Sequence, residues 1–231
     1  GHTSSDDAAA DAALMALAYP GKHIMLEWSR KDDHMWEPYG SALMIDLEAS
    51  LDDSGNISQW LIDVWTDSAS TRPNKDAGTL VTARYLENPM PMKGRGYLNG
   101  GHRNADPYYD IPNFRVNAHF LEGPLRVSSL RSLAAFGNIF ALESFMDELA
   151  DLAGQDPIDF RLAHLADPRA KAVLEKVRDM SQDIDLAAEE GLGYAFCRYK
   201  NNSAYCALAV KLSVDLQQGS IRLLKMWTAV D

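Results

Sequence analysis

The sequence predicts an α+β fold, in which mixed or antiparallel sheets pack with helices. Alternating apolar residues mark two hairpins, one over about 43–64 and one from about Gly191 to the end of the chain. Apolar residues at helical spacing mark helices before and between these hairpins. Because helices and strands come in blocks rather than in strict alternation, the class is α+β rather than α/β.

The first part of the chain predicts a helix, a strand and a second short helix. Ser5 or Asp6 is a suitable N-cap for a helix that runs to about Ala18 and ends at "YPG". The segment "HIMLEW" indicates a short buried strand. Ser29 then caps a brief helix through "RKDDHMW".

The first hairpin has a clear period of two. Its apolar residues alternate with polar ones from Leu43 to Leu51, "DDSGN" supplies the turn, and Trp60, Ile62 and Val64 resume the alternation. Residues 67–110 are rich in Gly, Pro and Asn, so they are expected to form long loops, with a short helix around 80–86.

The second half predicts a strand, three helices and the closing hairpin. "FRVNAHFLEG" indicates the strand. The first helix has an apolar stripe of Leu142, Phe145, Met146, Leu149 and Leu152, an acidic stripe of Glu143, Asp147, Glu148 and Asp151, and its end at Gly154. Two "DP" pairs, Asp156–Pro157 and Asp167–Pro168, each begin another helix. The closing "IRLLKMWTAV" is expected to be a buried strand.

Charge and cysteine content exclude several kinds of protein. The 231 residues carry a net charge of −11, which disfavours binding to nucleic acid or to anionic membranes. No apolar run approaches the roughly 18–20 residues of a membrane-spanning helix, so we expect no membrane insertion. Cys197 and Cys206 suit no zinc or iron–sulfur motif, so they are expected to be reduced, half-buried thiols.

Individual residues offer few candidates for chemistry. Asp32, Asp33, His34 and Glu37 are metal-ligand types, but acids beside a short helix are more often a solvated face, so no metal site is predicted. His102 and Asp106 are one candidate acid–base pair, in a loop, and they would suit a hydrolase. No nucleophile elbow and no phosphate-binding glycine pattern is found.

Two arginines are more unusual. Arg72 comes shortly after the second strand of the first hairpin, and Arg131 precedes a helix in the small-residue segment "SSLRSLAAFG". Arginine supplies a permanent charge with forked donors, which suits an anionic cofactor or developing negative charge on a substrate. The alternative is that each arginine pairs with one of the surplus carboxylates.

The block "LRSLAAFGNIFALESFMDELADLAGQDPIDFRLAHLADPRAKAVLEKV" resembles the large molybdopterin-binding subunit of the xanthine dehydrogenase and aldehyde oxidase family. The bacterial isoquinoline 1-oxidoreductase type of β-subunit is the nearest. "SASTRP", "GGHRNADPYYDIPN" and "GLGYAFCRYKNNSAYCALAVKLSVD" agree in order, so that the resemblance covers nearly the whole chain. The fold expected from it is that of the molybdenum cofactor-binding domains.

The resemblance also assigns roles to particular residues. The family segment Phe-Arg-Gly-Phe-Gly is matched by residues 130–134, which places Arg131 beside the cofactor. Leu133 stands where relatives have a substrate-stacking aromatic, and this departure disfavours purine-like substrates. Arg72 takes the place of a catalytic arginine that binds and polarises the substrate. Gly1 matches the last glycine of a cofactor loop.

The resemblance implies that the chain is a fragment of a molybdenum hydroxylase that oxidises an aldehyde or an N-heterocycle. Residues 1–155 would belong to a first molybdopterin-binding domain, and 156–231 to a helical connection and the start of a second. Relatives use molybdopterin, here expected in its cytosine dinucleotide form, and pass electrons to an iron–sulfur small subunit. Their catalytic glutamate lies in a stretch beyond this chain, so the fragment alone is expected to be inactive and to hold no molybdenum. A cytoplasmic location is expected and a periplasmic one stays open. The alternative hypothesis is a non-catalytic α+β binding or scaffold module.

Overall fold

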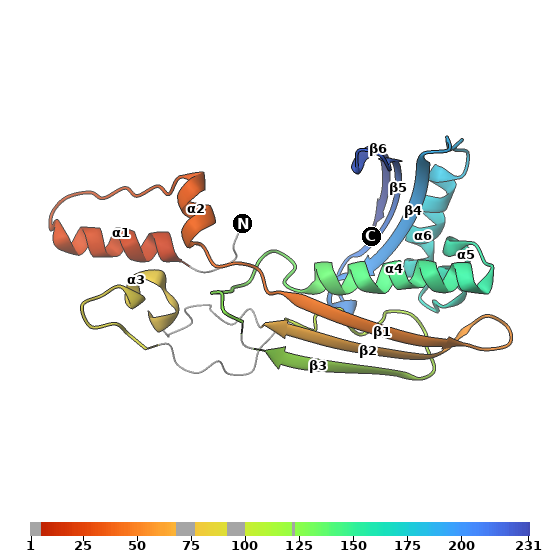
Figure 1. Cartoon of the computed structure of the whole chain (residues 1–231), viewed down its shortest axis with the longest axis horizontal. Coiled ribbons are helices and arrows are strands. Elements are labelled where there is room, and N and C mark those ends of the chain that lie inside the picture. The colour runs from red at the N-terminus through yellow and green to blue at the C-terminus, as the bar shows by residue number, and fades with distance from the viewer. Residues whose placement is uncertain (1–5, 68–76, 92–99, 122) are drawn as a thin grey trace. The chain divides into compact units, whose positions relative to one another are not determined.

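The computed structural model describes residues 6–67, 77–91, 100–121 and 123–231, and these form the predicted α+β fold (Figure 1). The helices are α1 (Asp7–Ala18), α2 (Arg30–Trp36), α3 (Val81–Arg84), α4 (Ala135–Ala153), α5 (Pro157–Ala163) and α6 (Pro168–Ser181), with short 3-10 turns at Ala77–Thr79 and Tyr199–Asn201. The strands are β1 (Leu43–Leu51), β2 (Ile57–Asp67), β3 (Phe114–Leu121), β4 (Glu190–Arg198), β5 (Tyr205–Asp215) and β6 (Ser220–Val230). None of the helices in this part of the chain combines the length and apolar character needed to cross a membrane.

The chain divides into two compact units. The first contains residues 1–44, 64–102 and 118–134, and the second contains residues 45–63, 103–117 and 135–231. Each unit therefore draws on several separate stretches of sequence. In the first unit an ion pair of Arg126 connects such stretches, and in the second the Glu143 carboxylate connects residues 103–117 with residues 135–231 through Tyr109.

In the first unit, Arg126 connects the helical segments. Its guanidinium forms an ion pair with Asp7 of α1 at 2.6 Å, with 9% and 2% of the two side chains exposed. It also donates to the carbonyl oxygens of Thr79 and Trp36. Asp7 in turn accepts a hydrogen bond from the backbone amide of Val81 at the start of α3. This single ion pair therefore ties α1, the end of α2 and the beginning of α3 to the segment around residue 126.

The first sheet has the order β1–β2–β3, with β2 in the centre. β1 and β2 are the two arms of the predicted hairpin, and β3 runs in the same direction as β2 (Figure 1), so the sheet is mixed. Trp60 and Ile62 of β2 are fully buried, and the Trp60 ring lies edge-on to Phe145 of α4 with 5.2 Å between centroids. The apolar face of the hairpin is therefore covered by α4, as its period of two predicts.

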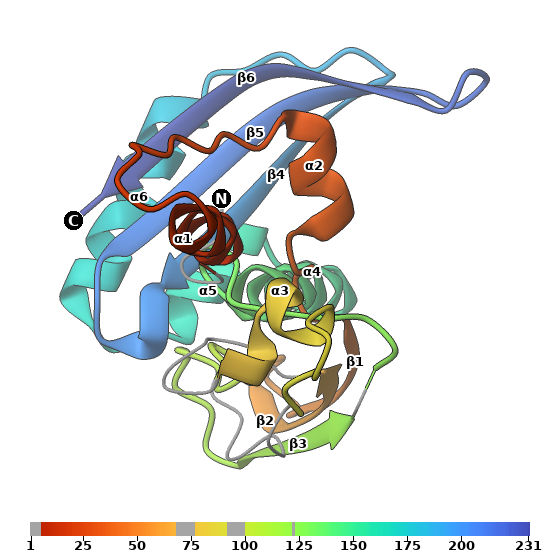
Figure 2. The ribbon, with the colours of Figure 1, turned by 90° about the vertical axis from the view of Figure 1, so that its left-hand side faces the viewer.

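The second sheet is antiparallel and has the order β4–β5–β6 (Figure 2). α6 packs on β5 and β6. Alternate residues of β5, including Tyr205, Ala207 and Ala209, are buried, while the residues between them are half-exposed. One face of this sheet is thus packed against the protein, and the opposite face is more accessible.

The two "DP" pairs begin helices as predicted. The Asp156 carboxylate accepts the backbone amides of Ile158 and Asp159 at the start of α5, and Asp167 accepts the amide of Arg169 at the start of α6. Asp167 also accepts the hydroxyls of Tyr108 and Tyr205 at 2.6 and 2.7 Å. These hydrogen bonds lower the pKa of the Asp167 carboxyl to about 2, because they stabilise its charged form.

Asp6 takes the N-cap position of α1 and the helix ends at Ala18, as predicted, although the Asp6 side chain makes no capping hydrogen bond; Ser5 lies outside the described residues. Three details of the sequence prediction are wrong. Residues 23–28 form no strand, and Met25 there is 91% exposed. β6 exists but is largely exposed, with Ile221 at 67% and Leu223 at 69%. Periodicity detects an apolar side of a segment, but it does not show whether another element covers that side.

The third error concerns α4. The predicted stripes put Glu143 on the exposed side and Leu152 on the buried side, whereas Glu143 is 4% exposed and Leu152 is 75% exposed. The reason is Arg161 of α5, whose side chain is fully buried and donates from Nε to Glu143 at 2.9 Å. Glu143 also accepts the backbone amide of Phe196 and the hydroxyl of Tyr109. A polar partner on another element therefore turns this acid inward.

We expect Glu143→Gln to lower the free energy of unfolding by about 3 kcal/mol, because it leaves the buried Arg161 charge without its most buried partner. Asp147→Asn is the matched control, since Asp147 also pairs with Arg161 at 2.6 Å but is 43% exposed. The Asp147→Asn substitution should lower the free energy of unfolding by less than about 1 kcal/mol. Urea unfolding followed by circular dichroism measures both. Equal losses in the two variants would contradict the dominant role of Glu143.

Candidate functional site

The segment that contains Arg131 forms a tight turn directly before α4. The backbone amide of Leu133 donates to the carbonyl oxygen of Leu130 at 3.0 Å, which closes the turn. The Arg131 side chain is exposed, and no hydrogen bond or ion pair to it is found among the described residues. The structure thus presents a guanidinium on a turn at the entrance to a helix, which is what the sequence suggested for an anion-binding group.

Two consecutive residues of this turn have left-handed backbone conformations. Ser132 has φ of 67° and Leu133 has φ of 58°. Such conformations are unfavourable for residues with a Cβ, and for bulky ones in particular. Ser132 is the residue that the family resemblance places opposite a glycine, which tolerates positive φ without cost. The strain is therefore located beside Arg131.

The turn is held by a second loop of the first unit. The amide of Ala134 donates to the carbonyl oxygen of Gly100 at 3.3 Å. A Cβ on Gly100 would lie 3.2 Å from the Leu133 side chain, so Gly100 permits this close approach. The space beside Gly100 is filled by the Leu133 side chain. The lack of a side chain at Gly100 therefore allows the turn to pack closely and leaves no room there for a ligand.

A third segment, residues 39–41, runs beside residues 126–128. Tyr39 and Val127 form a parallel bridge, and the amide of Ser128 donates to the carbonyl oxygen of Tyr39. On these two segments the hydroxyl oxygens of Ser41 and Ser128 are buried, and neither has a hydrogen-bond partner within the described part of the protein. Buried polar atoms of this kind are uncommon and call for a partner that the described residues do not supply.

The structure does not test whether the two arginines singled out from the sequence lie close together, because only Arg131 is among the described residues. Arg72 and Gly1 lie outside the described residues, so their predicted roles stay predictions. Leu133 is half-buried against Gly100, and its assignment to a substrate pocket likewise stays a prediction.

The other candidates have structural explanations. Asp32 completes a capping box with Ser29 at the start of α2, and these hydrogen bonds lower the pKa of its carboxyl. No group of three metal-ligating side chains is found among the residues that the structure describes. The His102 ring lies edge-on to Phe120, and Asp106 is exposed, so nothing supports the acid–base pair.

The sequence analysis missed two arginines that the described part of the chain holds in its interior, Arg161 with no exposed side-chain surface and Arg126 with 9% of its side chain exposed. Arg126 and Arg161 each pair with carboxylates, which is the alternative stated above for Arg72 and Arg131. A usable signal existed for Arg161, because it lies in the otherwise apolar run "FRLA" at the end of a short helix. A charged residue in such a run points to a buried ion pair.

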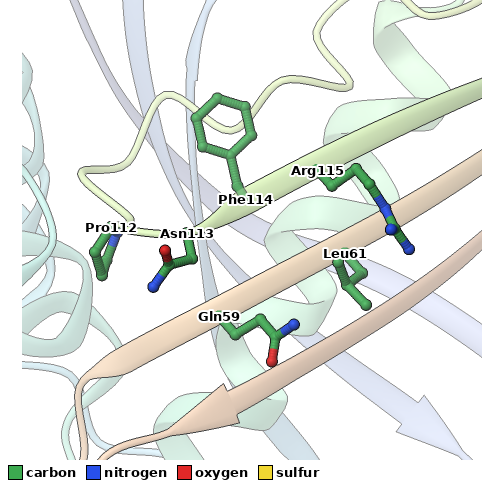
Figure 3. A pocket seen from close by; sticks show the side chains of 6 residues that line it. All are labelled: Gln59, Leu61, Pro112, Asn113, Phe114 and Arg115. Atoms are coloured by element: carbon green, nitrogen blue, oxygen red, sulfur yellow. The ribbon is translucent and has the colours of Figure 1, made fainter.

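A shallow groove of about 430 Å³ lies on the second unit between β2 and β3. Figure 3 shows Gln59 and Leu61 reaching into it from β2, with Arg115 nearby on β3 and the Phe114 ring pointing away. Asn113 beside it donates to the carbonyl oxygen of Ser58. Amide, guanidinium and aliphatic groups line this groove, and it presents no nucleophile or general base for catalysis.

Comparisons with known proteins place the chain within longer oxidoreductase subunits. No family model matches the chain. It is 29% identical over 98% of its length to the B subunit of nicotinate dehydrogenase of Pseudomonas putida, and 30% identical over 96% to the beta subunit of isoquinoline 1-oxidoreductase of Brevundimonas diminuta. A membrane-bound aldehyde dehydrogenase (pyrroloquinoline-quinone) of Gluconacetobacter polyoxogenes is 27% identical over 65% of the chain.

The chain spans 20% of the first of these relatives and 27% of the second. Among solved structures, the aldehyde oxidoreductase of Desulfovibrio gigas aligns with 80% of this chain and 21% of its own, at 17% identity and a TM-score of 0.46. The sequence relatives confirm the resemblance: the chain is homologous to one segment of a large oxidoreductase subunit. Within that class, it is related to the subunits of bacterial enzymes named for nicotinate and isoquinoline.

We expect Ser132→Gly to raise the free energy of unfolding by up to about 1 kcal/mol, because glycine removes the left-handed strain beside Arg131. Ser54→Gly is the control: Ser54 is exposed in the β1–β2 turn without positive φ, so glycine there only adds entropy to the unfolded chain. It should lower stability by about 0.5–1 kcal/mol. Urea titration of both variants measures the difference, and a loss of stability in Ser132→Gly would show that the turn is not strained.

Proposed function

We propose that this chain is part of the large, molybdopterin-binding subunit of a molybdenum hydroxylase that oxidises an aldehyde or an N-heterocycle. The observation that carries the proposal is the similarity at 29% and 30% identity, over nearly the whole chain, to subunits of enzymes named for two N-heterocycles. The chain covers a minor share of those subunits. The activity therefore belongs to the complete enzyme, to which this segment contributes residues.

The residues around Arg131 suit an anionic cofactor. The exposed guanidinium supplies charged, forked donors for phosphate or oxo groups. The buried hydroxyls of Ser41 and Ser128, which lack partners among the described residues, are two further groups able to donate to such oxygens. The strained turn at Ser132 and Leu133 is consistent with a conformation held for function, since strain of this kind clusters at ligand sites.

The roles of this chain's residues follow from charge and shape. Bound molybdopterin with its metal supplies the two-electron oxidation and the oxygen that is added to the substrate. Arg131 holds the anionic groups of that cofactor by charge-assisted hydrogen bonds. Arg72 donates to the substrate atom on which negative charge develops, a contribution of the size of an oxyanion-hole donor, about 3–4 kcal/mol. Leu133 forms an apolar wall that lacks the stacking face of an aromatic ring.

The remaining parts of the enzyme follow from the same proposal. Both relatives are named as one subunit of a larger enzyme, which supports a partner subunit. We assign that partner the iron–sulfur clusters that accept the electrons, and we assign the cofactor its cytosine dinucleotide form. A domain boundary near residue 155 and a cytoplasmic location belong to the proposal too. The −11 charge of the chain argues against nucleic acid as a partner.

The metal content of the purified enzyme separates this proposal from a quinone-dependent one. The name of the Gluconacetobacter relative includes pyrroloquinoline quinone, so that cofactor is the second candidate. Stoichiometric molybdenum by plasma mass spectrometry supports the proposal. A fully active enzyme without molybdenum would overturn it.

We expect Arg131→Ala to lower the molybdenum content of the complete enzyme about ten-fold, since hydrogen bonds to a charged group contribute about 1.5–3 kcal/mol. Arg131→Lys should retain part of the content, because lysine keeps the charge but lacks the fork. Arg30→Ala is the control, as Arg30 is an exposed arginine of the same unit. Full loading of Arg131→Ala would remove Arg131 from the cofactor site while leaving the function of the enzyme in place.

We expect Arg72→Ala to lower kcat/KM about 10²–10³-fold with molybdenum fully loaded, because a donor to developing negative charge acts mainly in the transition state. The loading is measured alongside steady-state turnover of an N-heterocycle and an aldehyde. Arg72→Lys should recover part of the rate. Unchanged turnover in a fully loaded Arg72→Ala enzyme would assign Arg72 to an ordinary ion pair.

A further inference from the structure

Cys197 and Cys206 lie directly opposite each other in the second sheet. The antiparallel pairing of β4 with β5 makes them Cα partners. Directly opposed residues of two neighbouring strands project from the same face of a sheet. Both are free thiols and both are half-buried. The two sulfur atoms are therefore neighbours on one surface, although eight residues separate the cysteines in the sequence.

This surface is the more accessible face of the sheet. Phe196 and Ala207, the neighbours of the two cysteines on their strands, are also Cα partners and are fully buried on the packed face. Because side chains alternate along a strand, Cys197 and Cys206 project to the opposite face. Small oxidants can therefore approach them without unfolding of the helices.

The backbone geometry of the pair suits a disulfide with some strain. In the same register, the amide of Val214 donates to the carbonyl oxygen of Glu189, and the amide of Tyr199 to that of Ala204. Along the strands, Cys197 and Cys206 lie two positions from the second of these pairs and eight from the first. Because both offsets are even, the cysteines are also a hydrogen-bonded pair, with Cα atoms about 5.5 Å apart. Disulfides span about 4.4–6.8 Å between Cα atoms.

The Cβ atoms of opposed residues are about 4.5–5.5 Å apart, whereas a disulfide needs about 3.5–4.5 Å. The strands must therefore draw together slightly when the bond forms. Strain of this kind raises the reduction potential, so that the bond is easily reduced again.

The two thiols also influence each other electrostatically. Burial raises the pKa of the Cys197 thiol to about 11, and the nearby Glu143 and Cys206 shift it in the same direction. Burial raises the pKa of the Cys206 thiol as well. Both groups are protonated at neutral pH, so their oxidation is slow and needs an oxidant at substantial concentration.

We propose that Cys197 and Cys206 are a reversible dithiol–disulfide pair, which closes by exchange with a low-molecular-weight disulfide such as oxidised glutathione. The thiolate of one cysteine attacks one sulfur of the small disulfide, forms a mixed disulfide and releases one thiol. The thiolate of the other cysteine then attacks the protein sulfur, forms the Cys197–Cys206 bond and releases the second thiol. Two electrons pass from the cysteines to the small disulfide, and the two thiol protons pass to the released thiols.

The bond would act at a sensitive place in the second unit. Cys197 follows Phe196, whose backbone amide donates to the buried Glu143 at 2.7 Å. Closing the bond fixes this end of β4 to β5 and thereby reinforces the position of that amide. The oxidised form should accordingly resist unfolding better than the reduced form.

The test uses the purified enzyme that carries this chain, incubated with oxidised glutathione or with a reductant, then alkylated and digested with trypsin. The cysteines fall in separate tryptic peptides, residues 179–198 and 201–211, because Arg198 and Lys200 lie between them. We expect oxidation to replace the two alkylated peptides by one disulfide-linked pair. The mass of this pair is lower by two hydrogens than the summed mass of the two unmodified peptides. Reductant should restore the two alkylated peptides.

Cys197→Ser and Cys206→Ser are the matched variants, and circular dichroism checks that each is folded. In each, the remaining cysteine should form only a mixed disulfide with glutathione, or stay reduced. Alkylation of both cysteines in the oxidised wild-type enzyme would overturn the proposal. Mixed disulfides at both positions, without a cross-link, would overturn it equally, because the second exchange would then have failed.

Discussion

The second unit depends on one buried ion pair, Arg161 with Glu143. A guanidinium with no exposed surface is tolerable only when its donors are satisfied, and here they reach Glu143, Asp147 and backbone carbonyl oxygens. The Glu143 carboxylate is also satisfied, because it accepts hydrogen bonds from the backbone amide of Phe196 and the hydroxyl of Tyr109. These contacts join α4, α5, β4 and the loop before β3. The position of each element is therefore restricted by the need to satisfy the same two charges.

The first unit contains a comparable ion pair, between Arg126 and Asp7. The chain has an excess of acids, 33 against 22 basic residues, so a buried arginine readily finds a carboxylate. Against this background the exposure of Arg131 is informative. It lies on a strained turn, in the same unit as two buried hydroxyls that lack partners in the described part of the chain. Arg126 and Arg161 connect elements of the fold, whereas Arg131 is exposed and is the residue that we propose binds the cofactor.

A site of this kind is assembled from several segments. In the first unit, Gly100 and residues 39–41 each approach residues 126–134 through backbone hydrogen bonds and close glycine contacts. The chain is homologous to about a fifth to a quarter of the larger subunits. A cofactor held by such a subunit would receive ligands from other parts of the polypeptide as well. Arg131 and the serine hydroxyls are then one portion of its surroundings.

The sequence by itself determined the class of the fold, both hairpins, the helices with their Asp–Pro starts, and the kinship with oxidoreductase subunits. The fold class, the hairpins and the helix starts depend on local periodicity and capping, which neighbouring residues carry in full. The kinship depends instead on the resemblance of whole sequence blocks to those of the family. The tertiary structure decided that Glu143 is buried, that β6 is exposed, that residues 23–28 form no strand, and that Arg126 and Arg161 form ion pairs with Asp7 and Glu143. Each of these features depends on whether an element far away in the sequence forms an ion pair with the residue or packs over it, and the local sequence pattern does not specify this.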